Sequence, residues 1–302
     1  MKLFDLHADL GYAVWQKHEA GYTDILSSFY TDALRKGGIK AVFMACWFDG
    51  TQDFDQMCAM IHALKADIAR SDDVRLVMDA SLIDWSDDKI YAMLSVEGMC
   101  GIDRDPEARI DWLYAQGVRM GALCWNEENA LAAGWLSSRG LTLLGIRAVR
   151  HMERIGMRID VSHAGEQTFW DIAKQTKGVL VASHSNAAAL CPHPRNLRDE
   201  QIRLIASRGG LIGAAAVGAF VDEREECRDF AHFTRHIDHL CQVAGEAHVG
   251  FGFDFERYYA GSGDGVRGLG APEEAGALIR WLKEQGADKK TASENAVRIF
   301  SF

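Results

Sequence analysis

The chain has 302 residues, of which 48% are hydrophobic, and it carries a formal net charge of -10 at pH 7. A chain of this length and apolar content can bury a large core, which excludes a disordered protein. The acidic balance argues against nucleic acid or an anionic membrane as a partner, because affinity for either comes chiefly from Lys and Arg, and it favours a small-molecule partner.

Short apolar runs alternate with longer amphipathic stretches along the chain. The runs predict eight strands, at residues 2–7, 40–48, 91–98, 117–126, 157–163, 178–185, 210–217 and 248–255. The stretches predict helices at residues 54–70, 105–117, 141–156, 165–176, 199–210 and 229–245. Glycines such as Gly156 and Gly209 stand where the apolar periodicity stops, which suits a left-handed helix C-cap. The acidic stretch 70–89 is expected to be a solvated excursion.

This alternation predicts an α/β fold, a (β/α)8 TIM barrel of the metal-dependent hydrolase type, with near-continuous apolar strands buried on both faces. A doubly wound open sheet is the competing architecture. Because no internal repeat, low-complexity tract or Pro/Ser-rich linker divides the chain, we expect a single domain over residues 1–302. The glycine-rich stretch 258–274 is expected to form a mobile loop over the barrel mouth.

Cysteine usage and the start of the chain indicate a cytoplasmic protein. The seven cysteines form no CxxC pair, and their odd number leaves at least one free thiol, which suits a reducing compartment. The opening "MKLFDLHADL" enters a strand-like run at once, without the pattern of a signal peptide. No run of about 18 apolar residues is present, so no membrane-spanning segment is expected.

Polar residues gather at the carboxyl ends of the predicted strands, where the active site of a barrel lies. They are His7, Asp9, Glu97, His163, His184 and Asp254. A single histidine is more often structural, but so many ionisable groups at one rim would cost several kcal/mol each without a metal or pairing. Imidazole and carboxylate suit Zn²⁺, and five ligands suit two ions that share a bridging carboxylate and a hydroxide.

Seven segments of the chain carry a family resemblance, in order from residue 4 to residue 300. They read "DLHADL", "LSVEGM", "RIDVSHAG", "VASHSNA", "CPHPRNLRDEQIRLIASRGGLIG", "HVGFGFDFE" and "SENAVRIF". Together they resemble the membrane (renal) dipeptidase family of metallopeptidases, peptidase family M19, within the amidohydrolase superfamily. The resemblance implies a binuclear zinc dipeptidase that hydrolyses short dipeptides, including L-Xaa-D-Xaa, with a metal-bridging hydroxide. It also implies a homodimer.

The resemblance further implies a role for each site residue. His7 and Asp9 would bind one zinc, His163 and His184 would bind the other, and Glu97 would bridge the two ions. Arg195 in "PRN" matches the arginine that holds the carboxylate at the substrate's C-terminus, which its planar fork suits. Asp254 matches the acidic residue credited with proton handling.

The chain departs from the family pattern at residues that are expected to contact the substrate. Trp125 stands where the best-known members carry a histidine thought to hydrogen-bond the reacting carbonyl, and indole offers only one donor and no charge. Asn126 is either a replacement donor in the substrate site or the cap of a turn. Residues 215–217 are small where the family has larger side chains, which predicts a roomier pocket, and Glu256 and Arg257 alter the rim beside Asp254.

Other features leave alternatives open. His232, His236 and His239 share one helical face without the acidic partner of an HExxH motif, so structural roles are expected. Trp47 and Phe48 are candidates either for pocket lining or for aromatic core. Two other functions remain open: another amidohydrolase-type hydrolase, acting on a lactam, a lactone or an N-acyl amino acid, and a metal-containing binding protein with impaired catalysis.

Overall fold

Parallel strands form the centre of the computed structural model, which describes residues 1–259, 264–286 and 290–302. The strands are β1 Leu3–Ala8, β2 Ile39–Trp47, β3 Val74–Leu76, β4 Ile90–Glu97, β5 Val118–Ala122, β6 Arg158–Asp160, β7 Leu180–Ala182, β8 Leu211–Ala214 and β9 Val249–Phe251. Eight of them close into a ring in the order β1, β2, β4, β5, β6, β7, β8, β9 and back to β1. The predicted (β/α)8 barrel is therefore confirmed, and the open sheet was the wrong alternative.

The ninth strand, β3, corrects the expectation that residues 70–89 form a solvated excursion. β3 pairs with β4 in the register Val74 to Ile90 and Leu76 to Ala92. The segment that follows buries Val77, Ala80 and Ile83 at the amino end of the barrel, while its acidic residues stay at the surface. The high charge of the stretch concealed this apolar spacing.

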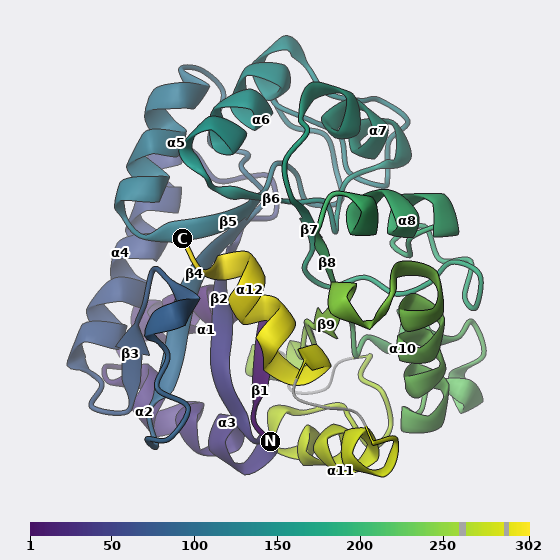
Figure 1. The fold of residues 1–302 in the computed structure, drawn as a ribbon. Helices are drawn as coiled ribbons and strands as arrows, with labels where there is room; N and C mark the ends of the chain where they lie inside the picture. The colour runs from purple at the N-terminus through teal and green to yellow at the C-terminus, as the bar shows by residue number, and fades with distance from the viewer. Residues whose placement is uncertain (260–263, 287–289) are drawn as a thin grey trace.

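Helices surround the barrel (Figure 1). They are α1 Leu10–Glu19, α2 Ile25–Phe29, α3 Thr31–Gly37, α4 Phe54–Arg70, α5 Pro106–Ala115, α6 Leu143–Ile155, α7 Glu166–Gln175, α8 Asp199–Ser207, α9 Gly218–Val221, α10 Phe230–Ala244, α11 Gly276–Glu284 and α12 Asn295–Phe300. All six predicted helices are present, as α4 to α8 and α10. Gly156 caps α6 at φ 81°, in the left-handed conformation that its position predicted. None of the helices in the described residues combines the length and apolar character needed to cross a membrane.

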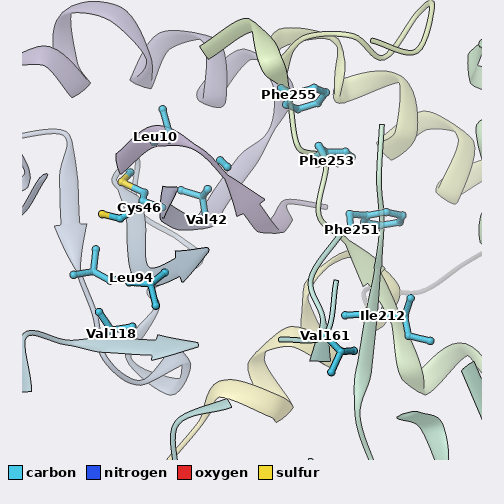
Figure 2. Packing of buried hydrophobic residues seen from close by; sticks show 14 of the residues in the cluster. Leu10, Val42, Cys46, Leu94, Val118, Val161, Ile212, Phe251, Phe253 and Phe255 are labelled. Atoms are coloured by element: carbon cyan, nitrogen blue, oxygen red, sulfur yellow. The ribbon is translucent and has the colours of Figure 1, made fainter. Parts of the chain in front are cut away.

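The core has two parts, one on each face of the barrel wall. Outward residues such as Val42, Leu94 and Val118, labelled in Figure 2, belong to one buried cluster with residues of the surrounding helices, such as Leu113. Inward residues fill the amino end of the barrel, and α12 closes that end, with the Phe300 ring 4.5 Å from the ring of Phe43. With the amino end plugged, the carboxyl end is left for a site.

The strands that lead to the site are shorter than predicted. β6 stops at Asp160, three residues before His163, because the Asp160 carboxylate accepts hydrogen bonds from the backbone N–H groups of Ser162 and Ser183, at 3.0 Å each. Side-chain acceptors thus replace the ladder bonds of the next strand positions. His163 and His184 consequently stand on loops just past the strand ends.

Candidate active site

The five predicted metal ligands meet at the carboxyl end of the barrel, and each is at most 6% exposed. Nε2 of His7 lies 3.4 Å from Oδ1 of Asp9 and 3.5 Å from Oε2 of Glu97. The other oxygen of Glu97, Oε1, lies 3.4 Å from Nε2 of His184 and also contacts Nε2 of His163. Glu97 therefore faces one pair of residues with each of its oxygens.

The barrel strands aim these side chains inward. Glu97 is the last residue of β4, and alternation along the strand places it on the inward face with Met93, which packs in the barrel interior. In the register of the barrel it stands opposite Trp47, the last residue of β2. The pairing of β1 with β2 is irregular between Asp5 and Ala8, an irregularity of the kind that re-aims side chains beside active sites, and His7 lies within it.

A hydrogen bond at the second ring nitrogen fixes the orientation of His163. Oδ1 of Asn126 lies 2.9 Å from Nδ1 of His163 and accepts another hydrogen bond, of 2.6 Å, from Nε1 of Trp135. Because an indole nitrogen can only donate, the Asn126 atom is an oxygen, so Nδ1 of His163 must be the donor. The lone pair on Nε2 is then directed at Glu97.

His184 is held in the same way by residues that the sequence analysis did not single out. Its Nδ1 lies 2.7 Å from Oγ of Ser183, which in turn donates to the carboxylate of Asp160. The Ser183 hydroxyl therefore accepts from Nδ1 and leaves the lone pair on Nε2. Both residues stand in the quoted segments "DVSH" and "ASHS". Asp160 and Ser183 lie close to predicted strand ends, and this position could have marked them as residues that support the site.

The arrangement fits a metal centre better than a set of hydrogen bonds. Nε2 of His163 and Nε2 of His184 lie 3.0 Å apart, and both carry lone pairs. Arg195 donates to Nε2 of His163 only, so a metal ion would relieve the repulsion between the two nitrogens. Nε2 of His7 and Oδ1 of Asp9 are buried without a hydrogen-bond partner. Two groups of potential ligands share Glu97: His7 with Asp9 and Glu97, and Glu97 with His163 and His184. A third group, His7 with Asp160 and His184, uses a carboxylate that already accepts hydrogen bonds from two backbone N–H groups.

The pKa shifts of His163, His184 and Glu97 favour the protonation states that metal ligands need. Burial, followed by the charge of Arg195, lowers the pKa of His163 to about 4, and burial lowers that of His184 as well, so both rings are neutral at pH 7. Although burial opposes ionisation of Glu97, His163 and His7 hold its pKa well below the ordinary value. Burial also acts against a charge on His7, yet Glu97 and Asp9 raise its pKa, which shows that this position attracts positive charge.

Arg195 lies beside the ligands with two of its guanidinium nitrogens, Nε and Nη1, unused. It is 4% exposed, one terminal nitrogen is 3.0 Å from Nε2 of His163, and its Nε and Nη1 have no hydrogen-bond partner. Its guanidinium carbon lies 5.3 Å from the ring centre of Phe220. Burial lowers its pKa to about 10, which still leaves it charged at neutral pH. A buried guanidinium with free donors suits an anionic ligand group.

Asp254 is a further carboxyl group beside His7. Its Oδ1 lies 3.8 Å from Nε2 of His7, and its backbone adopts φ 57°, in the left-handed region that a non-glycine residue rarely occupies. Its backbone N–H donates to the carbonyl of His7 at 3.2 Å, which joins the end of β9 to β1. Burial raises the pKa of Asp254 to about 8, although His7 opposes the shift, so this carboxyl group can exchange a proton near neutral pH.

A cavity of about 350 Å³ opens onto these residues. The predicted site residues on its surface are Asp9, Glu97, Trp125, Asn126, His163, Arg195 and Asp254. The sequence analysis missed Trp135, His193, Phe220, Tyr259 and Asp264, which also line it. Of the small residues 215–217 only Val217 reaches the cavity, since the backbone of Ala215 is paired with the Asn186 side chain. The part of the expected mouth loop at residues 260–263 lies outside the described residues.

The three histidines of α10 have protein partners. Nδ1 of His232 donates to Asp229 at 2.7 Å, Nε2 of His239 lies 2.8 Å from Asp199, and Nε2 of His236 donates to the carbonyl of Val221 at 2.9 Å. His232 also approaches Asp222 and Cys227, a further group of potential metal ligands. Because Arg224 already donates to both oxygens of Asp222, we assign no metal to that group.

Comparison with known proteins places the chain in one family. The model of the family described as membrane dipeptidase (peptidase family M19) matches residues 1–302. A protein of Klebsiella pneumoniae, described as an uncharacterized protein in the pqqA 5' region, is 37% identical over 238 residues, which are 72% of this chain and 82% of the relative. A protein of Schizosaccharomyces pombe described as an uncharacterized dipeptidase is 30% identical over 304 residues, covering 89% of this chain and 71% of the relative.

The barrel also matches a solved structure over nearly its whole length. A metallopeptidase from Rhodobacter sphaeroides, liganded with a phosphinate mimic of the dipeptide L-Ala-D-Ala, superposes with a TM-score of 0.86 at 23% identity. The match covers 99% of this chain and 98% of that chain, and at this identity it shows the shared fold. By its family match and its relatives, the chain belongs to the membrane dipeptidase family, peptidase family M19, and is a metallo-dipeptidase.

Proposed function

We propose that this chain is a binuclear zinc dipeptidase that hydrolyses the peptide bond of free dipeptides. The observation that carries the proposal is the double use of Glu97, whose two oxygens face two separate groups of buried ligands. His7 and Asp9 would hold one ion, His163 and His184 the other, and Glu97 would contact both. Imidazole and carboxylate are donors that zinc accepts. Bound there, two ions would lower the pKa of water and polarise the scissile carbonyl.

Arg195 positions the substrate in this proposal. Its Nε and Nη1 lack partners, and they can donate to the carboxylate at the C-terminus of a dipeptide. An internal peptide bond has no such carboxylate at this distance from the reacting carbonyl, so Arg195 would direct cleavage to the peptide bond next to a free C-terminus, which is the bond that a dipeptide offers. Trp125 forms a wall of the same cavity, and Asn126 acts through His163.

Asp254 moves the proton. Its carboxyl group lies at the cavity surface beside His7, and it would take a proton from the attacking water and return it to the leaving amine. The left-handed backbone at Asp254 turns the chain away from β9 directly after the strand, which leaves the carboxyl group facing the ligands.

We also propose that dipeptides ending in a D-residue are accepted. The Rhodobacter sphaeroides structure, which shares the fold, holds a mimic of L-Ala-D-Ala. A cavity of about 350 Å³ has room for either configuration of a small C-terminal residue.

Metal analysis and a substrate panel test the proposal together. We expect about two zinc ions per chain, by elemental mass spectrometry of protein purified without chelators, and release of amino acids from L,L or L,D dipeptides. Glu97→Gln should lose metal as well as rate, whereas Glu284→Gln, on the surface of α11, should lose neither. Two retained ions in Glu97→Gln would contradict the bridging role. If the fully metallated protein cleaves no dipeptide but opens lactams or lactones, or cleaves N-acyl amino acids, the dipeptidase proposal is wrong. The chain would then be another hydrolase of the amidohydrolase type.

The cysteines and the family resemblance bear on the cellular setting. All seven cysteines are free thiols, which supports the reducing cytoplasm as the compartment. The family resemblance supports a homodimer, and sedimentation equilibrium of the purified chain would test it.

A further inference from the structure

The cavity has two chemically different sides. Arg195 comes from the loop after β7, and Trp47 is the last residue of β2. In the ring of eight strands β2 and β7 are four places apart, so they stand across the barrel from each other. A dipeptide whose terminal carboxylate lies on Arg195 and whose peptide bond lies at the metal ligands therefore extends its amino-terminal residue toward the side of Trp47.

Aromatic rings cover the side that contains Trp47. The Trp47 ring lies 5.0 Å from that of Trp125, edge to face, and is stacked with that of Tyr259 at 6.4 Å. Tyr12 meets both Trp47 and Tyr259 edge to face, at 4.7 and 5.7 Å. Packing among the rings fixes the orientation of this wall, so it offers ring faces and edges to a ligand without rearrangement.

Among the described residues, one carboxylate on the cavity surface, that of Glu256, lacks a basic partner, and Glu256 stands three residues before Tyr259 in the chain. Asp264 is paired, because Arg228 donates to it at 3.0 Å and the backbone of Ala219 donates as well. Glu256 accepts only the backbone N–H of Asp264, at 3.0 Å, and within the described part of the chain no Lys or Arg nitrogen lies within 4.0 Å of it. Residues 260–263, which follow closely, contain no basic side chain in the sequence. Asp9, Glu97 and Asp254 already have roles in the proposed reaction, so Glu256 is the acidic residue left over.

We infer that the enzyme prefers dipeptides whose amino-terminal residue carries a positively charged side chain, and that Glu256 is the residue that selects it. The inference deepens the proposed function and rests on it. An ammonium or guanidinium group beside the aromatic wall gains cation–π attraction from Trp47 or Tyr259 and donates a charge-assisted hydrogen bond to the Glu256 carboxylate.

The same wall discriminates against an uncharged apolar side chain. Such a side chain would fit the rings, but it would remove water from the Glu256 carboxylate without offering a partner, and burying an unpaired charge is costly. A negative side chain would in addition face Asp9, Asp254 and Glu256. The preference therefore comes from rejection as well as from attraction.

A matched substrate series tests the inference. Lysyl-alanine and norleucyl-alanine have the same four side-chain carbons at the amino-terminal residue and differ by one ammonium group in place of a hydrogen atom. Alanyl-lysine and alanyl-norleucine place the same difference at the other end. For the metal-loaded enzyme we expect kcat/KM for lysyl-alanine to exceed that for norleucyl-alanine by roughly tenfold or more, the scale of one desolvated cation–π contact with a carboxylate. The two reversed dipeptides should differ much less.

The variant Glu256→Gln removes the charge and keeps an oxygen that can accept from the backbone of Asp264. It should lower kcat/KM for lysyl-alanine several-fold, because the attraction is lost, and raise kcat/KM for norleucyl-alanine, because no charge is left to desolvate, so that the preference disappears. Glu256→Lys should reverse the preference, in favour of glutamyl-alanine. Glu284→Gln on α11 is the matched control and should change no ratio.

The outcomes separate the inference from the function on which it rests. Equal rates for lysyl-alanine and norleucyl-alanine in the unaltered enzyme would overturn the preference while leaving a dipeptidase. Equal losses for both substrates in Glu256→Gln would show that Glu256 serves the backbone of every dipeptide, which overturns its selective role. Failure to cleave any dipeptide would instead count against the proposed function.

Discussion

The side-chain oxygen of Asn126 lies 2.9 Å from Nδ1 of His163, and this contact decides which nitrogen of the ring is free to bind metal. Trp135 donates to the same oxygen and thereby fixes the amide orientation. Partners of this kind set the tautomer and the basicity of a metal-binding histidine. Asn126 is thus a positioning residue in our proposal, although it lies on the cavity surface.

Replacing Asn126 by leucine should weaken metal binding without removing a ligand. We expect Asn126→Leu to lower zinc affinity by roughly 10- to 100-fold, because His163 loses the acceptor at Nδ1. Asn126→Asp keeps an oxygen at that place and should retain most of the affinity. Competition with a chromophoric chelator measures both constants. An unchanged affinity in the leucine variant would mean that the contact does not orient His163.

Arg195 should govern substrate binding through the terminal carboxylate. Removing the guanidinium in Arg195→Met should lower kcat/KM for dipeptides by roughly 10- to 100-fold, mostly through KM, since a charge-assisted hydrogen bond contributes about 1.5–3 kcal/mol. Dipeptide amides, which lack the carboxylate, should be poor substrates of the unaltered enzyme and should lose little more in the variant. Steady-state kinetics on both series provides the measurement. Equal losses on acids and amides would remove this role from Arg195.

The barrel could be predicted from the sequence because the apolar composition of its strands is visible without knowing the neighbours of each strand. A strand buried on both faces is mostly apolar, and in a barrel the polar residues of the site gather at the carboxyl end, as in the segment that ends in Glu97. β3 escaped the prediction because it has three residues and pairs only with β4 at the barrel's end, so its pattern is too short to stand out among acidic neighbours.

The ionisable residues of the candidate site could be predicted from the sequence, whereas the residues that hold them in place by hydrogen bonds could not. His7 and Glu97 stand next to predicted strand ends, and the family resemblance assigned their roles. Ser183 and Trp135 act through single hydrogen bonds to neighbours distant in the chain, and serine and tryptophan have many other uses. Tyr259 reaches the cavity only because of the path taken by the chain after β9, which periodicity does not encode.

Two glycines near β9 differ in the space around them, and this difference yields a stability prediction. A Cβ at Gly252 would lie 1.8 Å from the carbonyl oxygen of Ser183, whereas a Cβ at Gly250 would meet only leucine methyl groups, at 3.4 Å or more. Gly252→Ala should therefore cost about 2–3 kcal/mol of unfolding free energy and disturb His184, which follows Ser183. Gly250→Ala should cost less than about 1 kcal/mol. Urea denaturation and zinc content of the two variants measure the contrast, which equal costs would contradict.

His236 ties together two loops that carry cavity residues. Its Nδ1 accepts the backbone N–H of Ala187 at 3.1 Å, in the loop that leads to Arg195, and its Nε2 donates to the carbonyl of Val221, next to Phe220. Both hydrogen bonds require the neutral ring. Burial lowers its pKa from 6.5 to about 4 in the folded protein.

This shift predicts a loss of stability in acid. Above pH 6.5 the ring is neutral in both folded and unfolded chains; between pH 6.5 and 4 the unfolded chain binds a proton that the folded protein excludes, so the contribution of His236 is lost as the pH falls. His236→Gln can keep both hydrogen bonds and does not titrate. The unfolding free energy of the unaltered protein, relative to this variant, should fall by roughly 2 kcal/mol between pH 7.5 and pH 4.5. Denaturation curves at both pH values test this, and a difference independent of pH would mean that His236 is not buried in its neutral form.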